Sequence, residues 1–395
     1  MGCGLRSVVK LLEIIDETFG GVFQGELPSH TEISNWAQKN GLATYTDSGK
    51  KFSGIEYCEI IDESITVGKQ KLLLTLATPS VPEGHPLRHE DVDVLGIAVA
   101  PSWNGDAVKK QLENCSHKAG HAPEYIVSDN GVNLSKGIRE AGITHHRDIS
   151  HSIGLILEGA YKGQADFEEF TSNLSSIRLK YHLTETAFLL PPKQRTIARF
   201  MNLFDWVQWA IDILRAYPTL EGKQQESFAF VVENKRLIDE LTSVMECVKT
   251  IEHQCKQEGI SRETAKRCAM VASKLITGRN ASRRTISIGS KIGLYLIGEA
   301  DKIVGKNKAH IISSDIIEST FGWFKTRKPC NKLCGVTASI LNIATIGKLS
   351  TKEGRANFDF KGNAESVRLV DVKEWKELNL LDNWAVNRMK VLKIG

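Results

Sequence analysis

Apolar residues recur every three or four positions at the start of the chain, which predicts a helix over residues 5–19. A glycine-rich stretch follows. The sequence Ser29-His30-Thr31-Glu32 then has the pattern of a capping box, so we expect a second helix that ends at Gly41. Two helices in this order are typical of a helix-turn-helix, although a small helical cap on the next domain fits the pattern equally well.

From residue 55 the pattern changes to alternation and to short apolar runs, which predicts strands. They are expected at residues 57–67, 71–78, 92–100, 125–128 and 143–149, with helices at 107–115 and 134–141. This order of strands and helices is that of a mixed sheet covered by helices.

After His151 the strand pattern stops, and residues 152–309 are helical in pattern almost throughout. This block holds an aromatic set that either forms the core of a helical bundle or stacks on unpaired bases. The set consists of Phe200, Phe204, Trp206 and Trp209. From residue 351 the patterns are weak, and we interpret this part as a small C-terminal extension.

The composition is that of an ordinary globular protein, with 395 residues, 41% hydrophobic and 25% charged. It excludes a disordered chain, a collagen-like fibre and a small disulfide-stapled scaffold. The net charge of +4 is too small to indicate a nucleic-acid partner by itself. The eight cysteines form no paired CxxC spacing, and no apolar run reaches the length of a membrane span. We therefore expect a cytoplasmic protein that does not contact membranes.

Positive charge is concentrated late in the chain. Residues 262–309 hold 11 lysines and arginines against three acids, a local excess of +8. A second basic cluster follows, made of Lys325, Arg327, Lys328 and Lys332. Such runs are often solvated faces, but together these two favour a path for nucleic acid.

Two aspartates occupy strand positions at which a carboxylate is unusual unless it binds a cation or another ligand. Asp62 lies in the middle of the apolar strand 57–67, where a buried carboxylate is expensive unless it meets a cation or strong donors. Asp129 ends the fourth strand, just before Asn130-Gly131, at the sheet edge where ligands often bind. The alternatives are that Asp62 faces solvent and that Asp129 is a turn residue.

A glutamate and a lysine follow on a late helix. Glu318 and Lys325 lie seven residues apart on one helical stripe, and Gly322 between them presents no side chain. This arrangement would let a metal ion and a phosphate backbone approach side by side. Alternatively, Asp315 and Glu318 together cap the start of the helix.

The three acids Asp62, Asp129 and Glu318 are hard oxygen ligands of the kind that suit Mg²⁺ or Mn²⁺. Two such ions serve phosphodiester chemistry in many enzymes.

In this order and setting, the acids resemble those of the DDE transposase and integrase superfamily, which has a ribonuclease H-like core. The matching motifs are IIDES around Asp62, VSDNG around Asp129 and IIESTFGWFK around Glu318. The first two acids are separated by 66 residues and the last two by 188, so the resemblance implies a helical insertion domain.

Two further features belong to this resemblance. Asp148 and His151 resemble the Asp/Cys-x-x-His signature of the insertion-bearing groups, and would support the site. A lysine at the position of Lys325 recurs in bacterial insertion-sequence enzymes, where Tyr and Arg also precede the glutamate; this chain has Ile311 and Ser314 there instead.

The expected fold is thus α/β, with a ribonuclease H-like mixed five-stranded sheet, flanking helices, a large all-α insertion and a preceding helix-turn-helix. The expected domains are a helix-turn-helix DNA-binding domain at 1–50, a core at 55–151 and 310–350, the helical insertion at 152–309 and the extension at 351–395.

The function that the resemblance implies is that of a DNA transposase of the insertion-sequence type. Asp62, Asp129 and Glu318 would hold two Mg²⁺ or Mn²⁺ ions, and Lys325 would hold a phosphate. Cleavage would free a 3′ hydroxyl, which would then attack target DNA. The expected DNA-binding residues are Ser29, Thr31, Asn35, Lys39, Arg283, Arg284, Arg327 and Lys328.

The expected partners are double-stranded DNA and a second copy of the chain in the synaptic complex, in the bacterial cytoplasm near the nucleoid. Two alternatives remain: a nuclease of the same fold that does not join DNA, and a transposase-derived DNA-binding regulator without catalysis.

Overall fold

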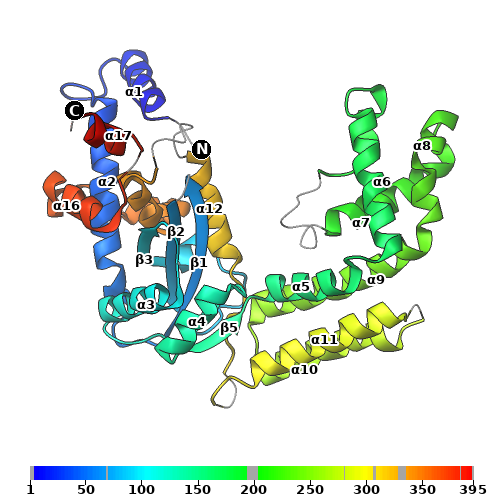
Figure 1. Ribbon diagram of the computed structural model, residues 1–395. Coiled ribbons are helices and arrows are strands. Elements are labelled where there is room, and N and C mark those ends of the chain that lie inside the picture. The colour runs from blue at the N-terminus through cyan, green and yellow to red at the C-terminus, as the bar shows by residue number, and fades with distance from the viewer. Residues whose placement is uncertain are drawn as a thin grey trace. The chain divides into compact units, whose positions relative to one another are not determined.

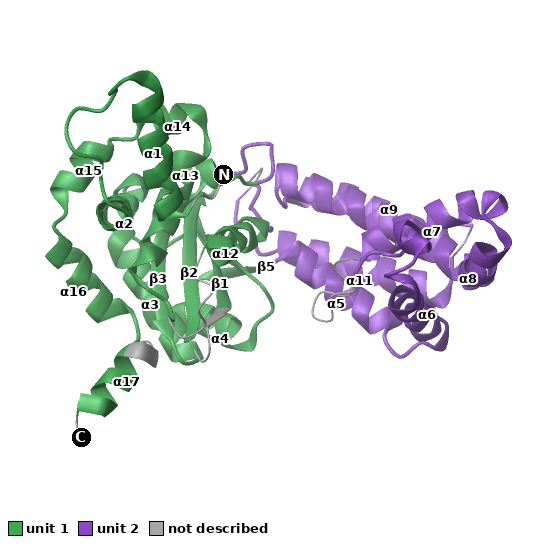
Figure 2. Ribbon diagram, turned by 90° about the horizontal axis from the view of Figure 1, so that it is seen from above, with its two compact units in different colours: residues 1–80, 87–146, 314–395 green, residues 81–86, 147–313 purple. Residues whose placement is uncertain are grey.

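The computed structural model describes residues 4–67, 70–193, 203–279, 281–305, 308–327, 335–382 and 384–393. It divides into two compact units, shown in Figure 2. Unit 1 comprises residues 1–80, 87–146 and 314–395, and unit 2 comprises residues 81–86 and 147–313. Along the chain, most of unit 2 is therefore inserted between the last strand of unit 1 and the helix that carries Glu318.

Unit 1 is built on a five-stranded mixed sheet with the strand order β3-β2-β1-β4-β5. Strands β1, β2 and β3 form an antiparallel meander, and β4 pairs with β1 in parallel. The strands are β1 (Tyr57–Val67), β2 (Gln70–Pro79), β3 (Asp93–Ala100), β4 (Tyr125–Ser128) and β5 (Thr144–Arg147). The predicted α/β class and the predicted mixed sheet of five strands are confirmed.

Two helices cover one face of this sheet, namely α3 (Gly105–Ala119) and α4 (Val132–Ala141). Their apolar residues pack with Ile61 of β1 and Ile126 of β4 in one buried cluster. The two helices approach each other closely, because a Cβ on Gly137 would lie 2.6 Å from the Val108 side chain. This cluster is the core beneath the sheet, and it determines which residues of β1 and β4 face the other way.

The N-terminal helices differ from the expected helix-turn-helix. The loop between α1 (Leu5–Phe19) and α2 (His30–Asp47) runs over residues 20–29, far longer than the three or four residues of that motif. The helix α2 continues past Gly41 to Asp47. Gly41 is needed for packing instead, because a Cβ on it would lie 2.7 Å from the Leu341 carbonyl. The second half of α2 is thus part of the core of unit 1.

The rest of unit 1 follows unit 2 in the chain. It begins with α12 (Asp315–Arg327), which runs alongside β1 (Figure 1). The expected small extension is integrated into the fold, since Val372 of α16 is buried in a cluster with Leu42 and Leu341. The remaining helical elements are η1 (Ser48–Phe52), η2 (His89–Asp91), η6 (Ala338–Thr345), α13 (Ile346–Ser350), α14 (Lys352–Asn357), α15 (Phe360–Ser366), α16 (Leu369–Asn379) and α17 (Trp384–Lys393).

Unit 2 is helical, with one isolated β-bridge between Ile260 and His310 among its described residues. A single large apolar cluster joins its helices. They are α5 (Ile149–Tyr161), α6 (Ala165–Tyr181), η3 (Glu185–Leu189), α7 (Leu203–Ala216), η4 (Tyr217–Thr219), α8 (Gly222–Glu233), α9 (Lys235–Glu258), α10 (Arg262–Thr277) and α11 (Arg283–Ala300).

The aromatic residues of α7 belong to this core. Trp206 is 1% exposed. The Trp209 indole donates to the Leu189 carbonyl at 2.8 Å, and its ring lies 6.1 Å from that of Phe228. The interpretation of these rings as a core is therefore correct, and that of a base-stacking platform is wrong for them; Phe200 lies outside the described residues.

Two general features of the chain follow from the described residues. Five of the cysteines are described, and each is a buried free thiol: Cys58, Cys115, Cys247, Cys255 and Cys268. Within the described ranges, no helix combines the length and the apolar character that a membrane crossing needs.

Candidate functional site

Asp62 lies in β1 and Asp129 directly follows β4, the strand that pairs with β1 in unit 1. The parallel pairing of β1 with β4 matches Ile60 with Val127. Continued two residues further, this register would set Asp62 opposite Asp129, which follows the last residue of β4. Neighbouring strands run about 5 Å apart, so this pairing brings together two segments whose acids have 66 residues between them in the chain.

Both acids belong to the sheet face opposite α3 and α4. Ile61 and Ile126 point into the cluster beneath those helices. Side chains alternate along a strand, so Asp62 and Asp129 belong to the other face. Both are half-buried. The carboxylates therefore lie outside the apolar core, on a face that another element can reach.

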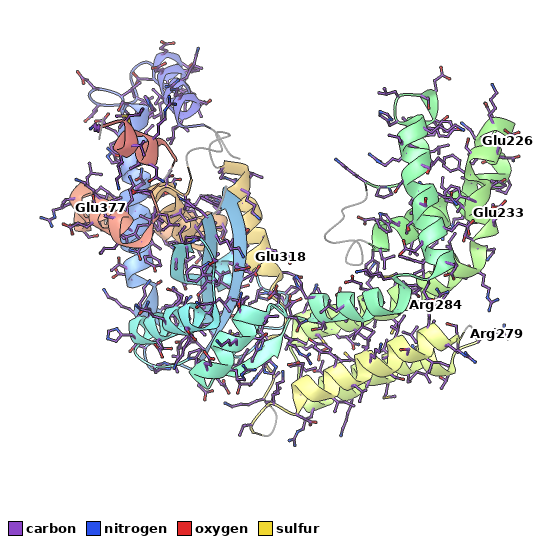
Figure 3. All side chains as sticks on the ribbon, viewed as in Figure 1. Glu226, Glu233, Arg279, Arg284, Glu318 and Glu377 are labelled. Atoms are coloured by element: carbon purple, nitrogen blue, oxygen red, sulfur yellow. The ribbon has the colours of Figure 1, made fainter. Side chains whose placement is uncertain are left out.

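That element is α12, which carries Glu318. The helix packs against β1, the central strand of the sheet, and the face below is already occupied by α3 and α4. The helix α12 must therefore lie on the other face of the sheet, the face to which Asp62 and Asp129 belong. Ile317, Phe321 and Phe324 form a buried apolar stripe of this helix, while Glu318 is exposed in the first turn (Figure 3).

The backbone around Asp129 holds its carboxylate in a tight turn. The Gly131 N–H donates to Asp129 Oδ1 at 2.8 Å. Among the described residues, no hydrogen bond to Asp129 Oδ2 is found. Asp62 accepts the N–H of Glu63 through Oδ1 at 2.7 Å.

The residues Gly322, Lys325 and Arg327, which follow Glu318 on α12, are exposed to solvent. Lys325 is exposed, and its Nζ lies 5.7 Å from the centre of the Phe321 ring. A Cβ on Gly322 would meet nothing within 4 Å, so packing does not require a glycine there. Arg327 is exposed with its guanidinium 4.3 Å from the Trp323 ring centre, and Lys328 lies outside the described residues.

Two histidines next to these acids were missed by sequence reasoning. His145 of β5 places Nε2 2.8 Å from Ser128 Oγ, and Ser128 immediately precedes Asp129. His89 of η2 places Nε2 3.1 Å from the hydroxyl of Ser319, which immediately follows Glu318. A serine beside each acid is visible in the sequence, but its histidine partner comes from another element.

A third acid of β1, Glu59, lies on the opposite face and is fully buried. Neither carboxylate oxygen has a hydrogen-bond partner among the described residues. Burial raises the pKa of Glu59 to about 8. Glu59 is thus neutral at pH 7 and belongs to the core rather than to the candidate site.

The predicted DNA-reading residues of α2 lie in its more exposed half. Ser29 is the N-cap, and its side chain accepts the Glu32 N–H at 3.2 Å while Glu32 accepts the Ser29 N–H at 2.8 Å. The predicted capping box is confirmed. Thr31 is exposed, whereas Asn35 and Lys39 are half-buried.

In unit 2, the predicted DNA-binding residues Arg283 and Arg284 differ sharply. Arg283 is exposed. Arg284 is 22% exposed, donates to both carboxylate oxygens of Asp166 at 2.8 and 2.5 Å, and has its Nε 2.9 Å from Glu240 Oε1. The Arg284 guanidinium lowers the pKa of Asp166. Arg284 is therefore held by ion pairs within unit 2, which disfavours the predicted contact with DNA.

Other charges of the basic stretch are also neutralised within unit 2. Arg267 pairs with Glu263 at 3.0 Å and with Glu258, and Lys302 pairs with Glu299 at 2.7 Å. Six exposed basic side chains remain without an acidic partner among the described residues. They are Arg262, Lys266, Lys274, Arg279, Arg283 and Lys291.

Asp148 and His151 also belong to unit 2 and form a local pair. Asp148 is buried at the N-cap of α5, where it accepts the His151 N–H at 2.7 Å. The same carboxylate oxygen lies 3.0 Å from His151 Nδ1. The predicted fifth strand is shorter than expected because this cap starts a helix at Ile149.

The residues of the candidate site fit a hard divalent cation. Asp62, Asp129 and Glu318 offer only carboxylate oxygens, the donors that Mg²⁺ and Mn²⁺ prefer. They lie on strand and helix positions of one sheet face, and neither Asp62 nor Asp129 is enclosed in the apolar core. The three carboxylates are candidate metal ligands, although they are not a group whose oxygens all lie within 4.8 Å of one another; among the described residues, Glu83, His85 and Asp91 form such a group.

The chain was compared with protein-family models and with curated proteins. No protein-family model matches the chain, and no curated protein is significantly similar in sequence.

Proposed function

We propose that this chain is a DNA transposase of the DDE type, with a ribonuclease H-like core in unit 1. The observation that carries the proposal is the parallel pairing of β1, which holds Asp62, with β4, which Asp129 follows, together with the packing of α12, which holds Glu318, against β1. The strand order β3-β2-β1-β4-β5 and the helical insertion between β5 and α12 support it, because both agree with the resemblance of the motifs.

Each residue of the site has a role in this proposal. Asp62, Asp129 and Glu318 would hold Mg²⁺ or Mn²⁺, two ions in all. Ions bound there would activate the attacking oxygen and neutralise the leaving oxygen in phosphodiester cleavage. Lys325 would hold a DNA phosphate two helical turns from Glu318, and the open space at Gly322 would admit the backbone between them.

Contact with DNA would come from basic residues beyond the site. Arg327 lies on the same helix as Glu318. The exposed Arg279 and Arg283 lie near the turn between α10 and α11 (Figure 3 labels Arg279), and they would neutralise phosphates of the transposon end. By analogy with the family, two transposon ends would be joined by a dimer.

The test is a cleavage and joining assay with the full chain. A supercoiled plasmid carrying the DNA that flanks the coding region is incubated with Mg²⁺ or Mn²⁺, and a second plasmid serves as target. We expect cleavage at the element's ends and transfer of these ends to the target. The variant Asp129→Asn should abolish both, while Asp106→Asn, an exposed aspartate of α3, should abolish neither.

The outcome also separates the alternatives. Cleavage without joining would indicate a nuclease, and DNA binding without metal-dependent cleavage would indicate a regulator. Cleavage by Asp129→Asn at the wild-type rate would refute the site itself.

A further inference from the structure

A buried serine links the second acid to a histidine on the neighbouring strand. Ser128 is fully buried at the end of β4, and its hydroxyl donates to the Asp129 carbonyl oxygen at 2.9 Å. The same Oγ lies 2.8 Å from His145 Nε2. A hydroxyl has a single proton, and here that proton points at the carbonyl. With the hydroxyl proton on the carbonyl side, the contact requires the tautomer of His145 that carries a proton on Nε2 and donates it to Ser128.

This chain of hydrogen bonds bears on the orientation of Asp129. The residue stands just beyond the last residue of β4, where strand pairing no longer holds the backbone. Its carbonyl is held by Ser128, and its Oδ1 is held by the Gly131 N–H at 2.8 Å. Loss of His145 would free the Ser128 hydroxyl to rotate and would loosen one of these two restraints.

A second contact of the same kind occurs at the third acid. His89 Nε2 lies 3.1 Å from the hydroxyl of Ser319, the residue after Glu318. His89 comes from η2, which precedes β3, so this contact ties the first turn of α12 to a distant segment of unit 1. That turn sets the direction of the Glu318 side chain. This contact is solvent-exposed, whereas Ser128 is buried.

We infer that His145 and His89 are positioning residues of the metal centre: each orients, through a serine hydroxyl, the backbone next to a carboxylate, Asp129 and Glu318 respectively. The inference rests on the proposed metal centre. Removal of such an outer partner typically weakens metal binding about 10- to 100-fold. We expect about a tenfold weakening for His145, and a smaller one for the exposed His89.

The experiment measures Mn²⁺ binding by titration calorimetry on the full chain, independently of activity. His145→Ala should weaken binding about tenfold. His145→Gln should restore most of it, because the amide N–H can donate to Ser128. His89→Ala should act in the same direction, with rescue by His89→Gln. His117→Ala, an exposed histidine of α3, is the matched control and should change nothing. The Mg²⁺ concentration for half-maximal cleavage should rise in parallel.

Ser128→Ala tests the same link without changing the histidine. It should weaken Mn²⁺ binding as His145→Ala does, and it decides the question if His145→Ala does not fold. Unchanged Mn²⁺ affinity in His145→Ala and Ser128→Ala would overturn the role of His145, and unchanged affinity in His89→Ala would overturn that of His89.

The failures of the two proposals are distinguishable. If the wild type binds Mn²⁺ and Asp129→Asn does not, but DNA is never cleaved, the transposase proposal fails while the affinities still decide the positioning roles. If the wild type binds no Mn²⁺, or if Asp129→Asn binds it normally, the positioning inference is overturned together with the metal centre.

Discussion

The buried carboxyl of Glu59 should make the stability of unit 1 depend on pH. Glu59 is 0% exposed, and burial raises its pKa from 4.5 to about 8. Between these pH values the unfolded chain has lost the proton and the folded chain has kept it, so the free energy of unfolding falls as pH rises. The decline starts near pH 4.5 and levels off above about pH 8.

The size of the effect follows from the same two pKa values. At about 1.4 kcal/mol per pH unit, the whole interval corresponds to about 5 kcal/mol. Between pH 5.5 and pH 8 the expected loss is about 3 kcal/mol, since both ends of the titration are then incomplete. The variant Glu59→Gln keeps the shape of the side chain and removes the titration, so this contribution should vanish.

Urea unfolding at a series of pH values tests this, followed by tryptophan fluorescence in a variant in which Trp103, in the cluster beneath α3 and α4, is the one tryptophan of the seven that is kept. Between pH 5.5 and pH 8, the free energy of unfolding should fall by about 3 kcal/mol more in the wild type than in Glu59→Gln. Glu113→Gln, an exposed glutamate of α3, should keep the wild-type slope. Equal slopes for the wild type and Glu59→Gln would refute a neutral, buried Glu59.

Three further predictions concern the candidate site and unit 2. Asp129→Asn should abolish metal-dependent DNA cleavage and leave DNA binding in a gel-shift assay nearly unchanged; a wild-type cleavage rate would contradict the site. Gly322→Ala should stabilise α12 by about 0.5–1 kcal/mol in thermal unfolding, because the added Cβ would meet no other atom within 4 Å. The same substitution should slow DNA cleavage, because it narrows the space beside Glu318. An unchanged cleavage rate would exclude a path for the DNA backbone at this position. Arg284→Ala should lower the free energy of unfolding of unit 2 by about 2 kcal/mol in urea, a value reduced because Asp166 is partly exposed. Arg283→Ala should change it by no more than about 0.5 kcal/mol. Equal effects of the two substitutions would contradict the ion-pair assignment.

Much of the secondary structure was predictable because it depends on local patterns. Alternating apolar residues placed the strands of unit 1 to within a few residues, and the capping box at Ser29 located the start of α2. The order of strands and helices predicted the mixed sheet. These features depend on the periodicity of side chains along one segment, which the sequence contains directly.

Glycines and charges were harder to interpret, because their roles depend on segments distant in sequence. Gly41 resembles a helix end, yet it lies inside α2 because Leu341 approaches its backbone. Arg284 resembles one more phosphate ligand, yet Asp166 and Glu240 from two other helices neutralise it. Neither partner can be recognised from the residues around it.

The sequence by itself determined which residue types are available to the candidate metal centre: an acid in the first strand, one at the end of the fourth and one on a late helix. Only the tertiary structure decided that Asp62 and Asp129 come from neighbouring strands, since that depends on the parallel pairing of β1 with β4. It also brought His145 and His89 to the serines beside Asp129 and Glu318. Side-chain contacts of this kind are set by packing between elements, and no periodicity along the chain encodes them.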